Sequence, residues 1–321
     1  MSKSYYYTAL LPLNVNERLT NYCNQKNIPM NKIRSIEQII APPAPHMVGD
    51  GFWVHNFLPG SRTLNLQRMS PFFLMDYGAK KEFHSTSKQR GVGSHPHRGF
   101  ETVTIAYHGR IAHHDSAGNE GIIKEGDVQW MTAAAGVLHK EYHEKVWSKK
   151  GGIMQMVQLW VNLPAKYKMT RPKYQAIEHK KFGKYELPDK LGVIEVIAGK
   201  YMKAKGAAST FTPIEMYNLR ANKGASVTFS FPDNFNTCFL IIEGNVKVND
   251  TKVTTDHLVL FANDGTDIHL EATEYAVVLV LSGQPINEPL VSYGPFLMNT
   301  NEEIMQAYED LNKGKFGKLD D

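Results

Sequence analysis

The residues best suited to chemistry lie in the stretch GSHPHRGFETVT, at positions 93–104. His95 and His97 are separated only by Pro96. In a β-strand, residues i and i+2 point to the same face, so both imidazoles could reach one metal ion. Pro96 favours extended backbone before it and lacks a backbone N–H, which predicts the rim of a sheet rather than a central strand. Alone, the pair indicates a metal site only weakly.

A second pair lies in the stretch VLHKEYHEK, at positions 137–145. His139 and Glu141 have the same i, i+2 spacing. Two such pairs on antiparallel strands could face each other across a small barrel and supply three neutral nitrogens and one carboxylate. Such a set leaves coordination positions open for water or substrate, as catalytic sites do. It suits Fe(II), Mn(II), Ni(II) or Cu(II) better than Mg or Ca.

The elements that must position these pairs are short strands. Runs of β-branched and aromatic residues recur along the chain, bounded by Gly, Asn, Asp and Pro. Many short strands with few helical patterns predict an all-β fold of sandwiches or barrels. The clearest runs are 51–58, 101–109, 126–133, 153–163, 192–199, 225–231, 237–249, 257–263 and 275–283.

One stretch near the end of the chain predicts a helix, at residues 299–317. Asn299 or Thr300 can cap its first turn, and two acidic residues follow the cap. Gly314 is suited to end it.

The strands fall into two blocks, which share a pattern of strand, Gly turn, strand and polar turn. A duplicated β-barrel explains this most simply. No His-x-His or His-x-Glu pair occurs after residue 190, so we expect a metal-free second barrel. The predicted parts are an N-terminal extension (1–29), a first barrel with the metal site (30–165), a linker (166–189) and a second barrel with the C-terminal helix (190–321).

Composition narrows the class of protein. The chain has 321 residues, of which 42% are hydrophobic and 21% charged, as in globular proteins. Its net charge of +4 is not gathered into a basic run, so we expect no direct nucleic-acid partner. Two distant cysteines, Cys23 and Cys238, cannot form a disulfide framework. No convincing signal peptide or membrane span is present, and we expect a cytoplasmic protein.

Four longer motifs connect the chain to a known family. HPHRGFETVT, HDSAGNEGIIKEGDVQWMTA, QLWVNLP and GPFLMNTNEEIMQA resemble stretches typical of pirins, which belong to the cupin superfamily. The resemblance covers roughly residues 30–317. It implies two consecutive cupin-type barrels (double-stranded β-helix, or jelly-roll), with a metal ion in the first.

The resemblance also implies the ligands and the metal. The ligand pattern of the family falls here on His95, His97, His139 and Glu141, and the expected metal is Fe(II), with Ni, Mn, Cu or Zn as alternatives. One departure concerns Ala134, where the family usually has glycine. If that position needs a positive φ, alanine introduces strain there.

Several neighbours of the pairs have more than one interpretation. Glu101 occupies the place of the carboxylate ligand in many cupins. In the pirin pattern Glu141 takes that role, so we expect Glu101 to lie behind the ligands or in the core, with a direct ligand as the alternative. His143 is an alternative ligand or a histidine at the rim. Trp130 and Met131 are core residues or the wall of a pocket for an aromatic substrate.

Three further histidines, His108, His113 and His114, lie on or near a predicted hairpin turn. We expect them at the surface.

The resemblance implies two classes of function. The first is a dioxygenase similar to quercetin 2,3-dioxygenase, which uses O2 to open a ring of a flavonol or similar aromatic enol, with Glu141 as general base. The second is a redox-sensitive iron-binding regulatory protein that binds a protein partner without turnover. A stable barrel with a vestigial metal site is the third alternative.

Overall fold

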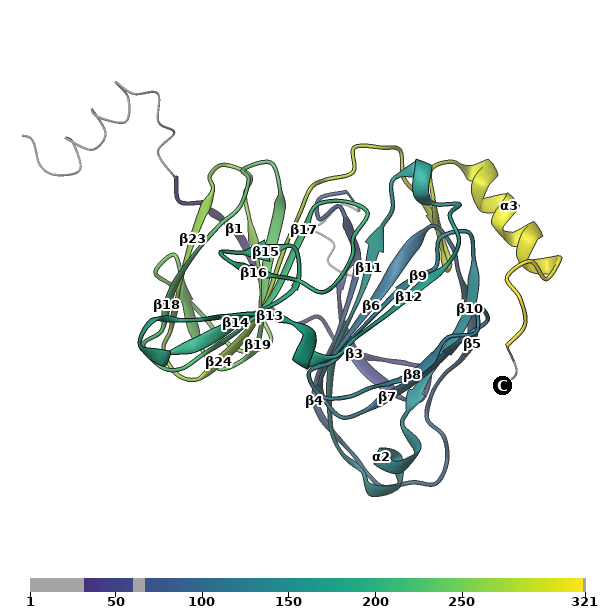
Figure 1. The fold of residues 1–321 in the computed structure, drawn as a ribbon, viewed down its shortest axis with the longest axis horizontal. Coiled ribbons are helices and arrows are strands. Elements are labelled where there is room, and N and C mark those ends of the chain that lie inside the picture. Colours follow the sequence, from purple (N-terminus) through teal and green to yellow (C-terminus); the bar gives the residue numbers. More distant parts are fainter. Residues whose placement is uncertain (1–31, 60–66, 320–321) are drawn as a thin grey trace, which may run out of the picture.

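The computed structural model describes residues 32–59 and 67–319, and the predicted extension, residues 1–29, lies outside them. Figure 1 shows two β-barrels side by side, with the last helix at one end of the molecule. Each barrel combines a seven-stranded sheet with a four-stranded sheet. The predicted all-β class, with two consecutive barrels and few helices, is therefore confirmed.

The first barrel carries the sequence pairs singled out above. Its seven-stranded sheet has the order β12 (Lys173–Ile177), β9 (Val128–Thr132), β6 (Phe100–His108), β11 (Gly152–Asn162), β4 (Phe72–Phe83), β3 (Phe52–Leu58) and β2 (His46–Val48). Its four-stranded sheet has the order β5 (Gly91–His97), β10 (Val137–His143), β7 (Ile111–Asp115) and β8 (Glu120–Ile123). The short helix α2 (Lys145–Lys150) follows β10.

The second barrel repeats this plan. Its larger sheet has the order β1 (Ile36–Ile40), β22 (Leu258–Phe261), β19 (Asn236–Glu243), β24 (Ala276–Gly283), β17 (Ile214–Ala221), β14 (Gly192–Ala198) and β13 (Gly183–Glu186). Its smaller sheet has the order β18 (Ser226–Ser230), β23 (Asp267–Ala272), β20 (Val246–Val248) and β21 (Thr251–Val253). Two hairpins, β15 (Lys200–Tyr201) with β16 (Ala204–Lys205) and β25 (Val291–Tyr293) with β26 (Phe296–Met298), lie outside the four sheets. Three single 3-10 turns connect strands at Ala165–Tyr167, His179–Lys181 and Pro188–Lys190.

The two large sheets pack against each other and form one apolar core between the barrels. Alternate residues of β6 and β11, such as Val103 and Leu159, meet residues of the second barrel such as Leu240 and Leu279. The other face of β24 points into the second barrel, where Val278 belongs to a separate core. A strand that is buried on both faces needs a continuous apolar run, which explains the sequence AVVLVLSG.

Two chain segments cross between the barrels. β1 lies early in the sequence but pairs with β22, at the edge of the second barrel. The predicted linker, residues 166–189, contributes β12 to the first barrel and β13 to the second. Edge strands satisfy their backbone groups on whichever sheet offers a free edge, and the sequence alone does not show which. The domain boundaries therefore stay a prediction.

The C-terminal helix α3 (Asn301–Asn312) forms as predicted and is capped by Thr300 in a capping box with Glu303. The predicted domain division places this helix with the second barrel, but in the structure the helix packs on the first barrel (Figure 1). Its buried face, including Ile304, meets Phe296 and Leu138.

A buried ion pair fixes this C-terminal arm, residues 290–317, to the first barrel. Arg98, directly after the His-Pro-His motif, donates to Asp310 at 2.9 Å, and both side chains are buried. The backbone N–H of Leu297 also donates to the carbonyl oxygen of Arg98. The apolar face of the helix and these polar contacts together explain its position.

Ala134 adopts a φ of +41°, so the position does need left-handed backbone. It is fully buried beside the start of β6, and its carbonyl oxygen accepts from the backbone N–H of Gly99. An alanine in this conformation costs about 1–2 kcal/mol relative to a right-handed one. The strain expected for this departure from the family pattern is therefore present.

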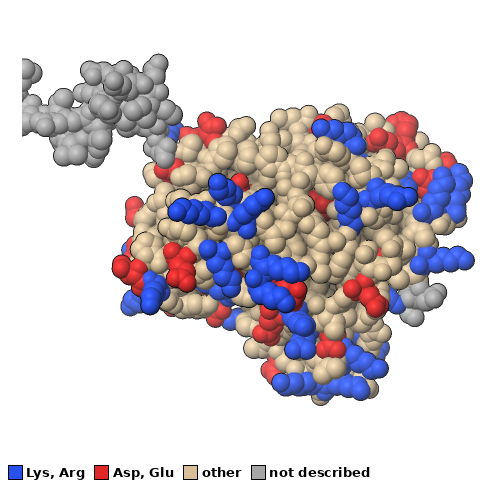
Figure 2. Space-filling view, viewed as in Figure 1, with Lys and Arg blue, Asp and Glu red and all other residues tan. Residues whose placement is uncertain are grey.

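Charged side chains of both signs are spread over the surface. On the face in Figure 2, Lys and Arg side chains lie over both barrels with Asp and Glu among them. None of the helices in the described part of the chain has the length and apolar character that a membrane-spanning helix needs.

Lys168 joins three segments around the His-Pro-His motif. Its ammonium donates to the carbonyl oxygens of Gly99 and Leu297 and to Oδ1 of Asn162, at 2.7, 2.8 and 2.6 Å. The side chain is 1% exposed, and burial lowers its pKa to about 7. A buried lysine is tolerated here because all three of its donor positions are used.

We expect Lys168→Met to lower the free energy of unfolding by about 1–3 kcal/mol, because three buried acceptors lose their donor. Denaturation by urea measures this. Lys166→Met, at an exposed position in the same turn, is the control and should change the free energy by less than about 0.5 kcal/mol. Equal effects of the two substitutions would contradict the role of Lys168.

Candidate metal centre

The two sequence pairs lie on neighbouring strands of the four-stranded sheet. β5 and β10 are antiparallel, and their register places His139 opposite His95. The pairs were expected to face each other across a barrel, so this part of the prediction is wrong. Cross-strand neighbours bring the imidazoles even closer, because opposite residues have Cβ atoms about 4.5–5.5 Å apart. β5 is the edge strand of its sheet, which confirms the rim position expected from Pro96.

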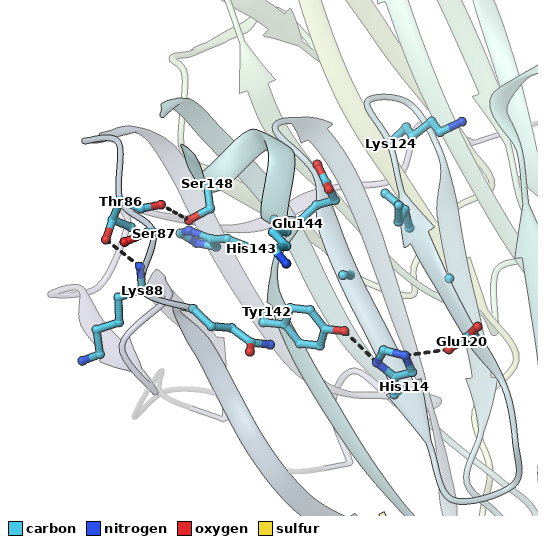
Figure 3. A pocket seen from close by; sticks show the side chains of 15 residues that line it. Thr86, Ser87, Lys88, His114, Glu120, Lys124, Tyr142, His143, Glu144 and Ser148 are labelled. Atoms are coloured by element: carbon cyan, nitrogen blue, oxygen red, sulfur yellow. Dashed lines mark hydrogen bonds and ion pairs between the residues drawn. The ribbon is translucent and has the colours of Figure 1, made fainter. Parts of the chain in front are cut away.

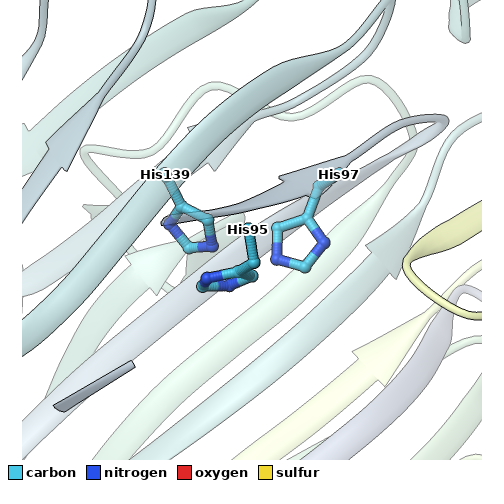
Figure 4. A group of neighbouring side chains, drawn as sticks. All are labelled: His95, His97 and His139. Atoms are coloured by element: carbon cyan, nitrogen blue, oxygen red, sulfur yellow. The ribbon is translucent and has the colours of Figure 1, made fainter. Parts of the chain in front are cut away.

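Three histidines converge (Figure 4). One nitrogen from each of His95, His97 and His139 lies within 4.8 Å of the other two. The ring centroids are 4.2 Å apart for His95 and His139, 4.7 Å for His97 and His139, and 4.8 Å for His95 and His97. Nitrogens bound to one ion at about 2.0–2.1 Å are at most about 4.2 Å apart, so small rotations of the rings complete the geometry.

The protonation states suit a metal. His97 is 3% exposed and His139 fully buried. Burial, followed by repulsion from the neighbouring histidines, lowers the pKa of both well below 6.5. Both rings are therefore neutral at pH 7 and offer a lone pair. His95 is only partly buried, and its Nδ1 lies 2.8 Å from the carbonyl oxygen of Gly93. If Nδ1 carries the proton, Nε2 of His95 is free to bind a metal.

Buried ring nitrogens without hydrogen-bond partners also indicate that these histidines can bind a metal ion. Among the described residues, Nδ1 of His97 and both ring nitrogens of His139 are buried and have no hydrogen-bond partner. A buried polar atom in this condition costs about 1–3 kcal/mol. A metal ion bound by Nδ1 of His97 and by one ring nitrogen of His139 would remove that cost for these two atoms, so the residues present fit a metal.

Glu141 lies on the same strand face as His139 but outside the group of three. Its Oε2 accepts from Gln158 at 2.6 Å and its Oε1 from Thr104 at 3.1 Å. Both donors belong to the opposite sheet, so they hold the carboxylate across the barrel interior. Burial raises the pKa of Glu141, and the nearby His95 opposes this. Glu141 as fourth ligand stays a prediction.

Glu101 points away from the histidines. Thr104 and Glu141 meet inside the barrel, whereas Glu101, three positions before Thr104, lies on the opposite face of β6. Its carboxylate accepts from Thr132 at 2.7 Å, and burial raises its pKa to about 7. The structure therefore does not bring Glu101 to the three histidines.

His143 is likewise separate from the group. Its Nε2 lies 2.7 Å from the carbonyl oxygen of Gly51. Its ring makes edge contacts with Phe52, Phe83 and Trp147. It is thus a buried histidine at the far end of β10 rather than one at the rim.

Trp130 and Met131 are neighbours on β9 and therefore point to opposite faces. Trp130 belongs to the core between the barrels. Met131 packs inside the first barrel with Val137 and Tyr174. Of the two, only Met131 is placed to line a pocket beside the histidines.

Sequence reasoning missed several polar residues inside this barrel, among them His113, Thr104 and Gln158. His113, expected at the surface, is fully buried and lies opposite Glu141 in the strand register. Burial lowers its pKa to about 4. Alternation could have shown that Thr104 and Gln158, which lie in predicted strands, face the barrel interior, whereas His113 lies in none of the predicted strands.

The outer face of the same strands carries a separate cavity of about 900 Å³. Tyr142 and His114 line it, and the hydroxyl of Tyr142 lies 2.7 Å from Nδ1 of His114 (Figure 3). Glu120 holds the other ring nitrogen at 2.7 Å. These residues alternate with Glu141 and His113, so the cavity lies behind the sheet and not over the three histidines.

We expect His139→Ala to abolish stoichiometric binding of Fe(II), because it removes the ring that contacts both other histidines. Metal content after anaerobic loading and desalting measures this. His84→Ala, at an exposed position, should bind as much metal as the unmodified protein. Full metal content in His139→Ala would refute the site.

Comparisons with known proteins agree with the fold and the motifs. Two family models match: pirin over residues 54–161, and the pirin C-terminal cupin domain over residues 216–317. A relative from Pseudomonas aeruginosa named "Putative quercetin 2,3-dioxygenase" is 44% identical over 84% of this chain and 94% of its own. A pirin-like protein of Solanum lycopersicum is 40% identical over 78% of this chain and 84% of its own.

A solved structure extends the similarity to three dimensions. The crystal structure of quercetin 2,3-dioxygenase from Acinetobacter baumannii is 47% identical, with a TM-score of 0.85, and covers 90% of this chain and 100% of that one. The cupin-type architecture and the resemblance drawn from the motifs are thus confirmed. The chain belongs to the pirin family, with two cupin domains in one polypeptide.

Proposed function

We propose that this protein is a mononuclear metal-dependent dioxygenase of the quercetin 2,3-dioxygenase type, with Fe(II) as its metal. The observation that carries the proposal is the group of three converging histidines, in which His97 and His139 have neutral buried rings with unpartnered nitrogens. A relative and a solved structure with quercetin 2,3-dioxygenase in their names support the choice of reaction. The substrate class is a flavonol or similar aromatic enol, together with O2.

His95, His97 and His139 would hold the ion, with Glu141 from the same face of β10 as the fourth ligand or as a base beside it. When bound, the metal would lower the pKa of a coordinated hydroxyl and give O2 access to the electron-rich substrate. His95 is the partly exposed member of the group, so the open side of the site is expected there.

Glu141 is suited to accept the proton of the enol hydroxyl at a carboxylate oxygen. Thr104 and Gln158 fix the position of both of its oxygens. Burial raises its pKa, which makes the carboxylate a stronger base than one in water.

Apolar and aromatic groups around the ligands would limit the access of water. Phe100 and Trp160 stack on each other with centroids 4.2 Å apart, and both contact His97. Met131 and Val137 pack on the neighbouring part of the interior. Exclusion of water strengthens the electrostatic interactions in such a site.

The direct test is anaerobic loading with Fe(II), followed by quercetin and O2. We expect loss of flavonol absorbance and release of carbon monoxide, with no turnover by the His139→Ala variant. Nickel, manganese, copper and zinc are tested in parallel. If the protein binds these metals stoichiometrically but none of them supports turnover, the result would contradict the proposal and favour the redox-sensitive, partner-binding role.

Glu141→Gln separates the two roles of this residue. As a general base, Glu141 contributes about 10²–10⁴-fold to the rate, so kcat should fall by that factor while metal content stays unchanged. Loss of metal in the same variant would instead make Glu141 an essential ligand. Unchanged kcat and unchanged metal content would contradict both roles.

A further inference from the structure

The interior of the first barrel holds more unpartnered polar groups than a metal ion can use. Among the described residues, buried polar side-chain atoms without a hydrogen-bond partner occur on His97 and His139, and a metal ion accounts for one ring nitrogen of each. Such atoms also occur on Thr102, His113 and Gln129, for which the metal does not account. Native proteins rarely bury polar atoms without hydrogen-bond partners, so the unpartnered atoms of these three residues require an explanation.

His113 presents a fixed ring to the interior. It is fully buried, and neither of its nitrogens has a hydrogen-bond partner. Its ring stacks on Tyr174 with centroids 4.8 Å apart and planes 7° from parallel. The ring of His139 lies 6.4 Å away. His113 is therefore held in place by stacking while both of its polar atoms stay available, one step beyond the metal ligands.

Gln129 lies on the facing wall. Glu141 of β10 meets Thr104 of β6 across the interior. His113 pairs with Glu141 on one sheet, and Gln129 pairs with Thr104 on the other. Tyr174 of β12, the strand beside β9, stacks on His113, so β7 faces β12 and β9 across the interior.

The amide of Gln129 is 1% exposed, and neither its oxygen nor its nitrogen has a partner. An amide and a neutral imidazole each offer one kind of donor and one acceptor. Neither carries a charge that would balance an anionic group. Burial of a carboxylate or phosphate here would therefore cost much free energy, whereas a neutral hydroxyl or carbonyl group can form hydrogen bonds with both His113 and Gln129.

We propose that His113 and Gln129 form a subsite for a neutral hydroxyl or carbonyl group on the part of the substrate remote from the metal. This rests on the proposed function, and it specifies the substrate further. The preferred ligand is an aromatic enol with additional ring hydroxyls, and not one with a carboxylate or phosphate. Thr102, on the same inward face of β6 as Thr104, adds a hydroxyl to this wall.

The test compares two flavonols by equilibrium titration under anaerobic conditions, with the protein loaded with Fe(II). Quercetin carries several ring hydroxyls, and 3-hydroxyflavone keeps the chelating hydroxyl and carbonyl but lacks the others. We expect His113→Leu and Gln129→Leu each to weaken quercetin binding about tenfold, the value of one good hydrogen bond. Binding of 3-hydroxyflavone should change by less than about twofold.

Controls separate this role from general damage. His143→Leu removes a buried histidine of the same barrel that lies away from the group, and it should weaken both flavonols equally or neither. His113→Asn keeps a donor and an acceptor and should recover part of the affinity for quercetin. Metal content is measured for every variant.

Several results would overturn the subsite. These are equal losses for the two flavonols, unchanged affinity in both leucine variants, loss of metal in His113→Leu, or failure of the unmodified protein to bind either compound. Because the readout is binding, selective weakening without any turnover would support the subsite while contradicting the dioxygenase proposal.

Discussion

The structure depends on the alternation of side chains along the seven-stranded sheet of the first barrel. One face must be apolar, because it packs on the second barrel. The other face is then free to be polar, and it holds the groups that position Glu141. Val103 and Thr104 show the division within two consecutive residues: the first belongs to the core between the barrels, and the second donates to Glu141. Among the described residues, the second barrel supports the site without contributing to the group of three histidines, since its own interior is filled by apolar residues such as Phe229 and Phe239.

A second requirement is that the ligand strand be fixed at its free edge. β5 has a partner strand on only one side, namely β10. Beyond its end, Arg98 and Gly99 are held by the C-terminal arm through Asp310, Leu297 and Lys168. The geometry of His97 is therefore set from two directions, by the sheet and by a segment almost two hundred residues later in the chain.

The sequence predicted the fold class, the two barrels, the C-terminal helix and the three histidines that converge, because these follow from local spacing and from motifs. It did not predict which strands would be neighbours, so the two pairs were expected across a barrel and not side by side. His113 was placed at the surface for the same reason: its strand is short, and its neighbour His114 does reach the outer cavity. The face on which Glu101 lies could not be predicted from its spacing to His97, because the two residues belong to different strands, β5 and β6.

The position of the C-terminal arm has a consequence for the order of events during synthesis. The His-Pro-His motif leaves the ribosome early, yet the contacts of Arg98 and Lys168 with the arm are available only after Leu297 and Asp310 have been made. A nascent chain can therefore pair β5 with β10 but cannot complete the surroundings of His97. Stable capture of the proposed metal ion would in this way be tied to completion of the polypeptide, because a chain shortened before the last helix would hold β5 only through its pairing with β10.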